Sequence, residues 1–234
     1  MKYIDAHCHL SNSENFSDVF MRANANGIVG CVLNSVSESD WQSISKLTHD
    51  NANIRGAIGI HPWHIETVSK AWQDNLIYLL NTNPNLMIGE IGLDKTRDNF
   101  ASQEKVFISA LEIAIKFNRI INLHCVHAWE RVLEILKSYR HELPTIVAHG
   151  FDGTQNAIDF DADIYFSYSP NIANPKYKRM AESVLRVPKN KILTESDSAD
   201  LSRVILTARG VSAIRSDVSP DDILQNAKRI FFNG

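Results

Sequence analysis

Short apolar runs alternate with longer amphipathic stretches from one end of the 234-residue chain to the other. The runs are rich in Ile, Val, Leu and Ala, which is typical of strands that are buried on both faces of a parallel sheet. Eight predicted strands cover residues 3–9, 28–33, 54–60, 86–91, 119–124, 145–149, 163–168 and 191–197. The pattern therefore predicts a sheet that is covered by helices.

The stretches between these runs repeat apolar residues at helical spacing. Helices are predicted over residues 13–26, 37–50, 69–81, 102–118, 129–139, 155–160, 176–185, 201–211 and 220–232. Ser37 or Ser39 is the expected N-cap of the second helix. Ser219, followed by Asp221 and Asp222, is the expected N-cap of the last one.

The number and spacing of these elements decide the predicted architecture. Eight strand–helix pairs at intervals of about 25 to 30 residues fit an α/β fold of the (β/α)₈ TIM-barrel type better than a doubly wound sheet. A glycine-rich phosphate loop is missing after the first run, which argues against a dinucleotide-binding fold. We expect a single TIM-barrel domain over residues 1–234, with catalytic groups at the carboxyl ends of its strands.

Histidines and acids stand at those predicted strand ends. They are His7, His9, His61, Glu90, His124, His149 and Asp197. Each one alone is typical of a solvated or hydrogen-bonded strand end, but buried together they would cost several kcal/mol without compensation, and a metal supplies it. His7 and His9 are two residues apart in a strand, so both side chains face the same way. The set exceeds the three protein ligands of one catalytic zinc, which predicts two ions, and a carboxylate such as Glu90 suits a bridge.

Composition restricts the partners of this predicted centre. Lys and Arg total 24 against 27 Asp and Glu, so a broad basic surface for nucleic acid is not expected and any phosphate recognition is local. The three cysteines, Cys8, Cys31 and Cys125, lack CxxC spacing and are predicted to be buried reduced thiols. Neither a signal-peptide core nor a membrane-length apolar run is present, so we expect a cytoplasmic protein.

The same residues lie in motifs that resemble a known family. The segments are Asp5-Ala-His-Cys-His9, Gly59-Ile-His-Pro62, Gly89-Glu-Ile-Gly-Leu-Asp94, His124, His149-Gly-Phe-Asp-Gly153 and Glu195-Ser-Asp-Ser198. In this order they resemble the motifs of the TatD-like metal-dependent deoxyribonucleases, which belong to the wider amidohydrolase-type barrels. The resemblance covers the whole chain, and the Gly-Glu-Ile-Gly-Leu-Asp motif is its most specific part.

The resemblance implies which of these residues bind each metal ion and which act in catalysis. One divalent ion would be held by four of them: His7, His9, Glu90 and Asp197. A second would be held by Glu90, His124 and His149, with zinc, magnesium and manganese as the candidate metals. Asp197 and Glu90 are the expected catalytic carboxylates, and Asp197 would orient or deprotonate the attacking water.

The resemblance also implies roles around the ions. His61 is expected beside the metals as a substrate-binding or supporting group, and Trp63 is expected to stack on a base. Glu195 has the strand parity of Asp197 and either faces the barrel interior or forms a structural hydrogen bond. His64 is expected on the surface.

Three departures from the family pattern affect the substrate side of the site. Val126 stands where an arginine after strand five is usual, and Lys95 replaces a tyrosine. Ser196 and Ala199 replace a threonine and a proline. We hypothesise that one of three nearby residues supplies the missing positive charge: Lys95, Arg97 or His127.

The function expected from this resemblance is a deoxyribonuclease or 3′-exonuclease that cleaves phosphodiester bonds of DNA with metal-activated water, acting on short single-stranded ends. One alternative is an ester, amide or phosphomonoester hydrolase on the same metal site, because one fold serves many reactions. The other is a catalytically weakened metal-binding scaffold, which the lost substrate-side residues favour and the intact ligands disfavour.

Overall fold

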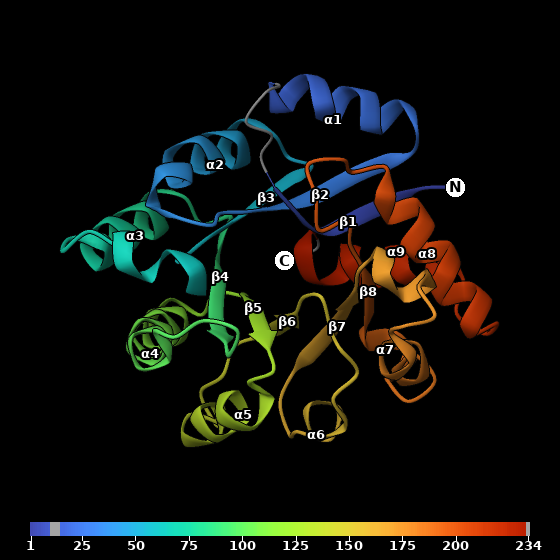
Figure 1. Ribbon diagram of the computed structural model, residues 1–234. Coiled ribbons are helices and arrows are strands. Elements are labelled where there is room, and N and C mark those ends of the chain that lie inside the picture. The colour runs from blue at the N-terminus through green and yellow to red at the C-terminus, as the bar shows by residue number, and fades with distance from the viewer. Residues whose placement is uncertain (10–14, 233–234) are drawn as a thin grey trace. The chain divides into compact units, whose positions relative to one another are not determined.

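The computed structural model of the protein describes residues 1–9 and 15–232. Within them one sheet holds eight strands in the order β1 to β8 (Figure 1). The strands are β1 Tyr3–Cys8, β2 Ile28–Asn34, β3 Ile54–Ile58, β4 Leu86–Asp94, β5 Ile121–Val126, β6 Ile146–Ala148, β7 Ile164–Tyr168 and β8 Ile192–Thr194. The end of β1 also meets the segment after β8, because Asp197 donates its amide to the His7 carbonyl at 3.0 Å. This topology confirms the predicted (β/α)₈ TIM-barrel class.

Helices alternate with the strands among the described residues. The α-helices are α1 Phe16–Ala25, α2 Glu38–Asp50, α3 Trp72–Thr82, α4 Phe100–Phe117, α5 Trp129–Ser138, α6 Gln155–Ile158, α7 Lys178–Ser183, α8 Arg203–Ile214 and α9 Pro220–Phe231. Three short 3₁₀ helices join them: η1 Pro62–Thr67, η2 Pro170–Ala173 and η3 Lys189–Lys191. Asn15 caps α1 by accepting the Ser17 amide at 2.8 Å, and the predicted start at Ser13 lies outside the described residues.

Several predicted strand boundaries were wrong. Strand β8 ends at Thr194 rather than at residue 197, because the chain then leaves the sheet and Asp197 adopts a left-handed backbone with φ 48°. Strand β4 continues to Asp94, since it pairs with β5 as far as Val126. Strand β5 starts two residues later than predicted, at Ile121.

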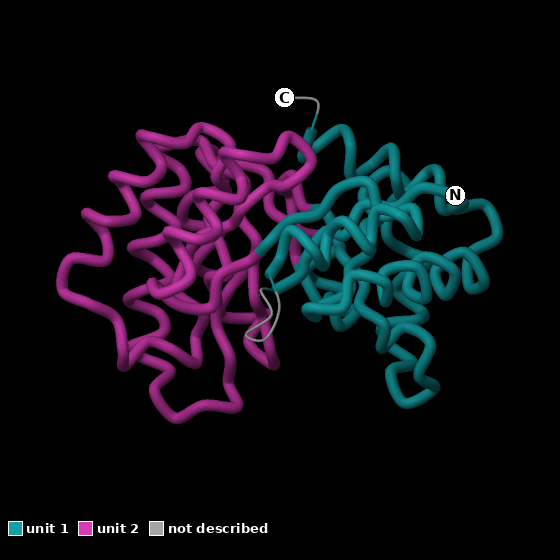
Figure 2. Tube along the Cα trace, turned by 90° about the horizontal axis from the view of Figure 1, so that it is seen from above, with its two compact units in different colours: residues 1–33, 149–158, 165–234 teal, residues 34–148, 159–164 magenta. Residues whose placement is uncertain are grey.

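The chain forms two compact units, coloured separately in Figure 2. Unit 1 comprises Met1–Leu33, His149–Ile158 and Tyr165–Gly234, and unit 2 comprises Asn34–Ala148 and Asp159–Ile164. The single domain over residues 1–234 stays a prediction.

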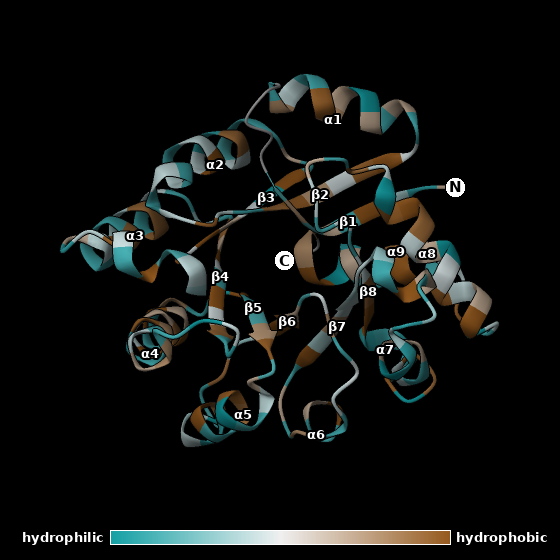
Figure 3. Ribbon diagram, in the orientation of Figure 1, coloured by the Kyte–Doolittle hydropathy of each residue, from teal (hydrophilic) through white to brown (hydrophobic). Residues whose placement is uncertain are grey.

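The core of unit 1 is built on β1, β2, β7 and β8. Pairs β1–β2 and β7–β8 are parallel, and hydrophobic residues recur along these strands (Figure 3). Cys8 and Cys31 are fully buried, and the Cys8 thiol donates to the Val32 carbonyl at 3.3 Å. Both are free thiols, as is Cys125 of unit 2, which confirms the prediction for all three.

The core of unit 2 is built on β3 to β6, whose neighbouring pairs are parallel. Trp41 of α2 is buried against this sheet, and its indole N–H donates to the Gly59 carbonyl at 3.0 Å. Ser37, rather than Ser39, is the N-cap of α2, and its amide donates to Asp40 at 3.3 Å. In the part of the chain that the structure describes, no helix is both long and apolar enough to cross a bilayer.

We expect the substitution Ser219→Ala to lower the free energy of unfolding by about 1 kcal/mol. The Ser219 hydroxyl accepts the Asp222 amide at 3.2 Å, and the Asp222 carboxylate accepts the Ser219 amide at 2.8 Å, so the change orphans a helix N–H. Urea denaturation measures the loss. Ser202→Ala is the matched control, because Ser202 precedes α8 without capping it, and a loss as large as that of Ser219→Ala would contradict the prediction.

Candidate metal centre

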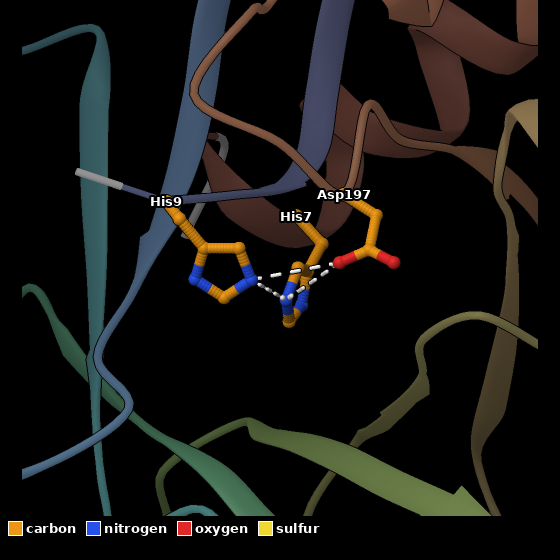
Figure 4. A group of neighbouring side chains, drawn as sticks. All are labelled: His7, His9 and Asp197. Atoms are coloured by element: carbon orange, nitrogen blue, oxygen red, sulfur yellow. Dashed lines mark hydrogen bonds and ion pairs between the residues drawn. The ribbon is translucent and has the colours of Figure 1, made fainter. Parts of the chain in front are cut away.

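Two imidazoles and a carboxylate converge in unit 1 (Figure 4). The Nε2 atoms of His7 and His9 lie 3.2 Å apart, and Asp197 Oδ1 lies 3.9 Å from the first and 3.5 Å from the second. His7 is fully buried, whereas the Asp197 side chain is 43% exposed. The group is therefore buried at His7 and open to water at Asp197.

Strand geometry and loop hydrogen bonds create this convergence. His7 is the last residue but one of β1, and alternation along the strand turns Asp5 and His7, and His9 just after the strand, toward the same side. The loop after β8 is held to β1 by two backbone hydrogen bonds, from Asp197 to His7 at 3.0 Å and from His9 to the Ser198 carbonyl at 3.2 Å. Together these bonds place the Asp197 carboxylate beside both imidazoles.

The separations fit coordination of one divalent ion. Two ligand atoms at about 2.1 Å from a tetrahedral ion lie roughly 3.4 Å apart. The three observed separations of 3.2, 3.5 and 3.9 Å bracket that value. Imidazole nitrogen and carboxylate oxygen are also ligands that zinc and manganese accept. The residues present therefore fit the metal that the resemblance implies.

His149 and Glu195 extend this group within unit 1. The His149 ring stacks on the His7 ring with centroids 3.9 Å apart, and its Nδ1 lies 3.5 Å from Glu195 Oε1. Glu195 is fully buried, its Oε1 accepts the Gly150 amide at 2.7 Å, and its Oε2 has no hydrogen-bond partner among the described residues. His149, Glu195 and Asp197 each offer a ligand atom within 4.8 Å of the others. Glu195 thus faces the cluster and also accepts a structural hydrogen bond, so it combines the two roles expected of it.

Asp5 is a buried acid that connects the two segments carrying the cluster. It is fully buried, and its Oδ1 accepts the amides of His7 at 3.2 Å and Ser196 at 2.9 Å. Burial raises the pKa of Asp5 to about 8, although hydrogen bonds from Ser196 and His7 act in the opposite direction. Asp5 therefore ties β1 to the loop after β8 by hydrogen bonds.

Unit 2 brings together a second group of ligand atoms. His124 Nδ1 lies 3.0 Å from Glu90 Oε1, and His61 Nε2 lies 3.3 Å from His124 Nδ1 and 3.5 Å from Glu90 Oε1. All three residues are buried, and their ligand atoms lie within 4.8 Å of one another. The separations again match those around one ion. His61 therefore belongs to the cluster itself, whereas the sequence had suggested a position beside the metals in a supporting or substrate-binding role.

Asp94 and Trp63 hold His124 from the other side. Asp94 Oδ2 lies 3.6 Å from His124 Nε2 and accepts the Trp63 indole N–H at 2.6 Å. Its Oδ1 accepts the amide and hydroxyl of Thr96 at 2.8 and 2.6 Å. Burial raises the pKa of Asp94, but the nearby His124 ring and the hydrogen bonds from Thr96 and Trp63 outweigh it and hold the pKa well below its ordinary value. The ionised carboxylate fixes the orientation of the His124 ring.

The sequence motif of β4 builds this arrangement. Glu90, Gly92 and Asp94 alternate along the strand, so the two acids share one side. Gly92 has φ 148°, and a Cβ placed there would lie 1.9 Å from the His124 carbonyl oxygen. Only glycine lets β4 approach β5 this closely, which brings Glu90 and Asp94 within reach of His124.

Each unit thus assembles part of the predicted ligand set. His7, His9, His149 and Asp197 meet in unit 1, and Glu90 and His124 meet in unit 2 with His61. Lys95 lies apart from that group, exposed, with Nζ 5.8 Å from the centroid of the Phe100 ring. Asp94 was not among the predicted site residues, although its strand parity with Glu90 was a signal that could have found it.

Known proteins resemble this chain in sequence over most of its length. The family model described as TatD related DNase matches residues 4–229. A 3′-5′ ssDNA/RNA exonuclease TatD from Salmonella typhimurium is 30% identical over 201 residues, which is 83% of this chain and 77% of the relative. An uncharacterised metal-dependent hydrolase from Mycoplasma pneumoniae is 28% identical over 220 residues, covering 87% of this chain and 84% of the relative.

Solved structures share the fold. The crystal structure of YjjV, a TatD homologue from Escherichia coli K12, superposes with a TM-score of 0.88 at 20% identity, over 99% of this chain and 98% of that one. A TatD family hydrolase from Entamoeba histolytica gives a TM-score of 0.82 at 17% identity, over 100% and 99% of the two chains. The family match, which spans nearly the whole chain, confirms the resemblance noted in the sequence. The chain therefore belongs to the TatD related DNase family of metal-dependent hydrolases.

Proposed function

We propose that the protein is a metal-dependent 3′-exonuclease that hydrolyses phosphodiester bonds at single-stranded DNA ends. The observation that carries this proposal is the pair of three-residue clusters whose ligand atoms are separated by distances suited to a divalent ion. The relatives named as single-strand exonucleases support the choice of substrate. The balance of 24 basic and 27 acidic residues also favours short ends over a long duplex.

We propose two ions, one for each cluster. His7, His9 and Asp197 would hold the first, and Glu90 and His124, with His61, would hold the second. When bound, such ions lower the pKa of water toward neutrality and offset negative charge on phosphate oxygens. The sharing of Glu90 by both ions and the assignment of His149 to the second stay predictions, as does a cytoplasmic location.

The side chains of the protein have separate tasks in the proposed reaction. Asp197 combines contact with two imidazoles and a partly exposed carboxylate, so it can orient the attacking water and accept its proton. Asp94 holds the His124 ring in place from the opposite edge. The His7 and His124 rings are buried, so their orientations are already set before the substrate binds. Less reorganisation of these side chains is then needed to reach the transition state.

The decisive assay offers the protein, loaded with zinc, manganese or magnesium, a 3′-labelled and a 5′-labelled single-stranded oligonucleotide. We expect stepwise shortening from the 3′ end, and loss of activity by about 10³-fold with a chelator or with His124→Ala. His49→Ala is the matched control, since His49 is an exposed histidine at the end of α2.

A duplex, a phosphomonoester and a carboxyl ester complete the panel. Hydrolysis of an ester or phosphomonoester without DNA cleavage would contradict the nuclease proposal and favour another hydrolase. If the protein binds its full complement of metal but hydrolyses none of these substrates, the result would favour a binding scaffold.

A further inference from the structure

Trp63 is an exposed aromatic side chain that is fixed in place. The residue is 53% exposed, yet its indole N–H donates to Asp94 Oδ2 at 2.6 Å. Its amide donates to His61 Nδ1 at 3.1 Å, and its ring meets the His61 ring edge-on at 5.3 Å. His61 is a member of the unit 2 cluster, and Asp94 contacts its His124 ring. The indole is therefore a rigid platform attached directly to that cluster.

Arg97 rests on this platform. Its guanidinium carbon lies 4.2 Å from the centroid of the Trp63 ring, a close cation–π contact. Its amide lies 3.4 Å from the Asp94 carbonyl, and the turn is tightened by the hydrogen bonds from Thr96 to Asp94. The backbone of Arg97 is thus held by Asp94 and its side chain by Trp63. Because the residue is already ordered, less conformational entropy is lost when it binds a ligand.

The hydrogen-bond donors of Arg97 are unused. Stacking occupies the face of a guanidinium but leaves its five in-plane N–H groups available. Among the residues that the structure describes, none receives a hydrogen bond or ion pair from this guanidinium. The other arginines of unit 2 all donate to protein acceptors: Arg55, Arg119, Arg131 and Arg140. Arg97 is the exception, and it is the one beside the cluster.

A cavity adjoins the same two side chains. It has a volume of about 380 Å³ and is lined by Trp63, His64, Glu66, Arg97, Asp98 and Asn99. This volume lies within the range of small-ligand pockets. An aromatic ring, a cation with free donors and the Asn99 amide are the groups that recognise a nucleotide by stacking, phosphate contact and base-edge hydrogen bonds.

We propose that Arg97, seated on Trp63, binds a phosphate of the substrate strand, and that the adjoining cavity receives the attached nucleotide. The inference rests on the proposed nuclease function and names its phosphate-binding residue. Arg97 is chosen over Lys95 because the Lys95 ammonium lies on Phe100 and has no described link to the cluster. Arg97 is chosen over His127 because an arginine is charged at every physiological pH, whereas a histidine is not.

The test separates binding from catalysis by using the metal-loaded protein with two versions of one single-stranded oligonucleotide. A phosphorothioate version that resists cleavage gives Kd by fluorescence anisotropy at several salt concentrations. The ordinary version gives kcat and KM. For Arg97→Ala we expect Kd and KM to rise about tenfold, and kcat to change by less than about twofold, since the contact is made before and during the reaction. The slope of log Kd against log salt should fall by about 0.7, the value for one lost phosphate contact on a single strand.

Four further variants exclude a merely structural effect. Arg97→Lys keeps the charge and should restore the salt slope with a partial recovery of Kd. Trp63→Phe keeps a ring and should bind more tightly than Trp63→Ala, which should resemble Arg97→Ala in Kd and in salt slope. Arg140→Ala is the matched control, because Arg140 is an exposed arginine of unit 2 that pairs with Asp161.

The outcomes distinguish this proposal from the proposed function. Equal Kd and equal salt slopes for Arg97→Ala and Arg140→Ala would overturn the role of Arg97 while leaving the nuclease intact. A salt slope that changes with Lys95→Ala and not with Arg97→Ala would overturn it in favour of Lys95. Arg97-dependent binding without any DNA cleavage would instead remove the nuclease function and support the phosphate site.

Discussion

Replacing Asp197 with asparagine is expected to lower kcat on single-stranded DNA by about 10³-fold while leaving the fold intact. Asparagine has the shape of aspartate but neither its charge nor its ability to accept a proton at neutral pH. The change removes the only carboxylate of the His7–His9–Asp197 group. We therefore expect the first ion to bind more weakly as well, which metal analysis of the purified variant would measure.

Backbone geometry dictates the choice of asparagine. Asp197 has φ 48°, a left-handed conformation that Asn and Asp tolerate better than Ala. Asp197→Ala would add backbone strain to the loss of the carboxylate, so a loss of activity could not be assigned to chemistry. Asp200→Asn is the control, because Asp200 is exposed three residues later and its Oδ1 accepts hydrogen bonds from Ser202. Wild-type kcat and metal content in Asp197→Asn would refute the assignment of Asp197.

The substitution Gly92→Ala is expected to cause the largest loss of stability, roughly 3 kcal/mol or more. The added Cβ would lie 1.9 Å from the His124 carbonyl oxygen, a backbone atom that cannot move without separating β4 from β5. The φ of 148° adds strain for any residue with a Cβ. Urea denaturation should show an earlier midpoint, or the variant should fail to accumulate as folded protein.

Gly150→Ala is the matched control for this prediction. Gly150 also has a positive φ of 53°, but the nearest atom to an added Cβ is Glu195 Oε1 at 3.9 Å. That variant should lose only about 1 kcal/mol, the cost of a left-handed alanine. Equal losses for both variants would mean that backbone conformation, rather than the contact with β5, explains the need for glycine at position 92.

The strands that carry the ligands could be predicted from the sequence because their apolar runs are short, regular and separated by helical patterns. His7, Glu90 and His124 each lie inside or at the end of such a run, so alternation fixed the direction in which each side chain points. The boundaries were less predictable. Residues 195–197 continue the polar alternation of β8 in the sequence, yet Ser196 and Asp197 leave the pairing with β7, and their amides donate to Asp5 and His7 instead.

The parts of the site that lie in loops were not predictable in the same way. His61 precedes the 3₁₀ helix η1, where strand alternation no longer applies, and its contact with His124 depends on the turn made by Pro62 and Trp63. The stacking of Arg97 on Trp63 joins the loop after β4 to η1, more than thirty positions away in the sequence. Such a contact depends on tertiary packing, which periodicity does not encode.

The hydrogen bond between the Asp197 amide and the His7 carbonyl has a consequence for biosynthesis. Position 197 follows position 7 by 190 residues along the chain, so the first metal cluster cannot form until translation has passed position 197. Incomplete translation products and fragments that stop ahead of β8 would therefore lack the Asp197 ligand of this cluster. The metal-dependent activity of the protein would thus appear only after the ribosome has made the segment that follows β8.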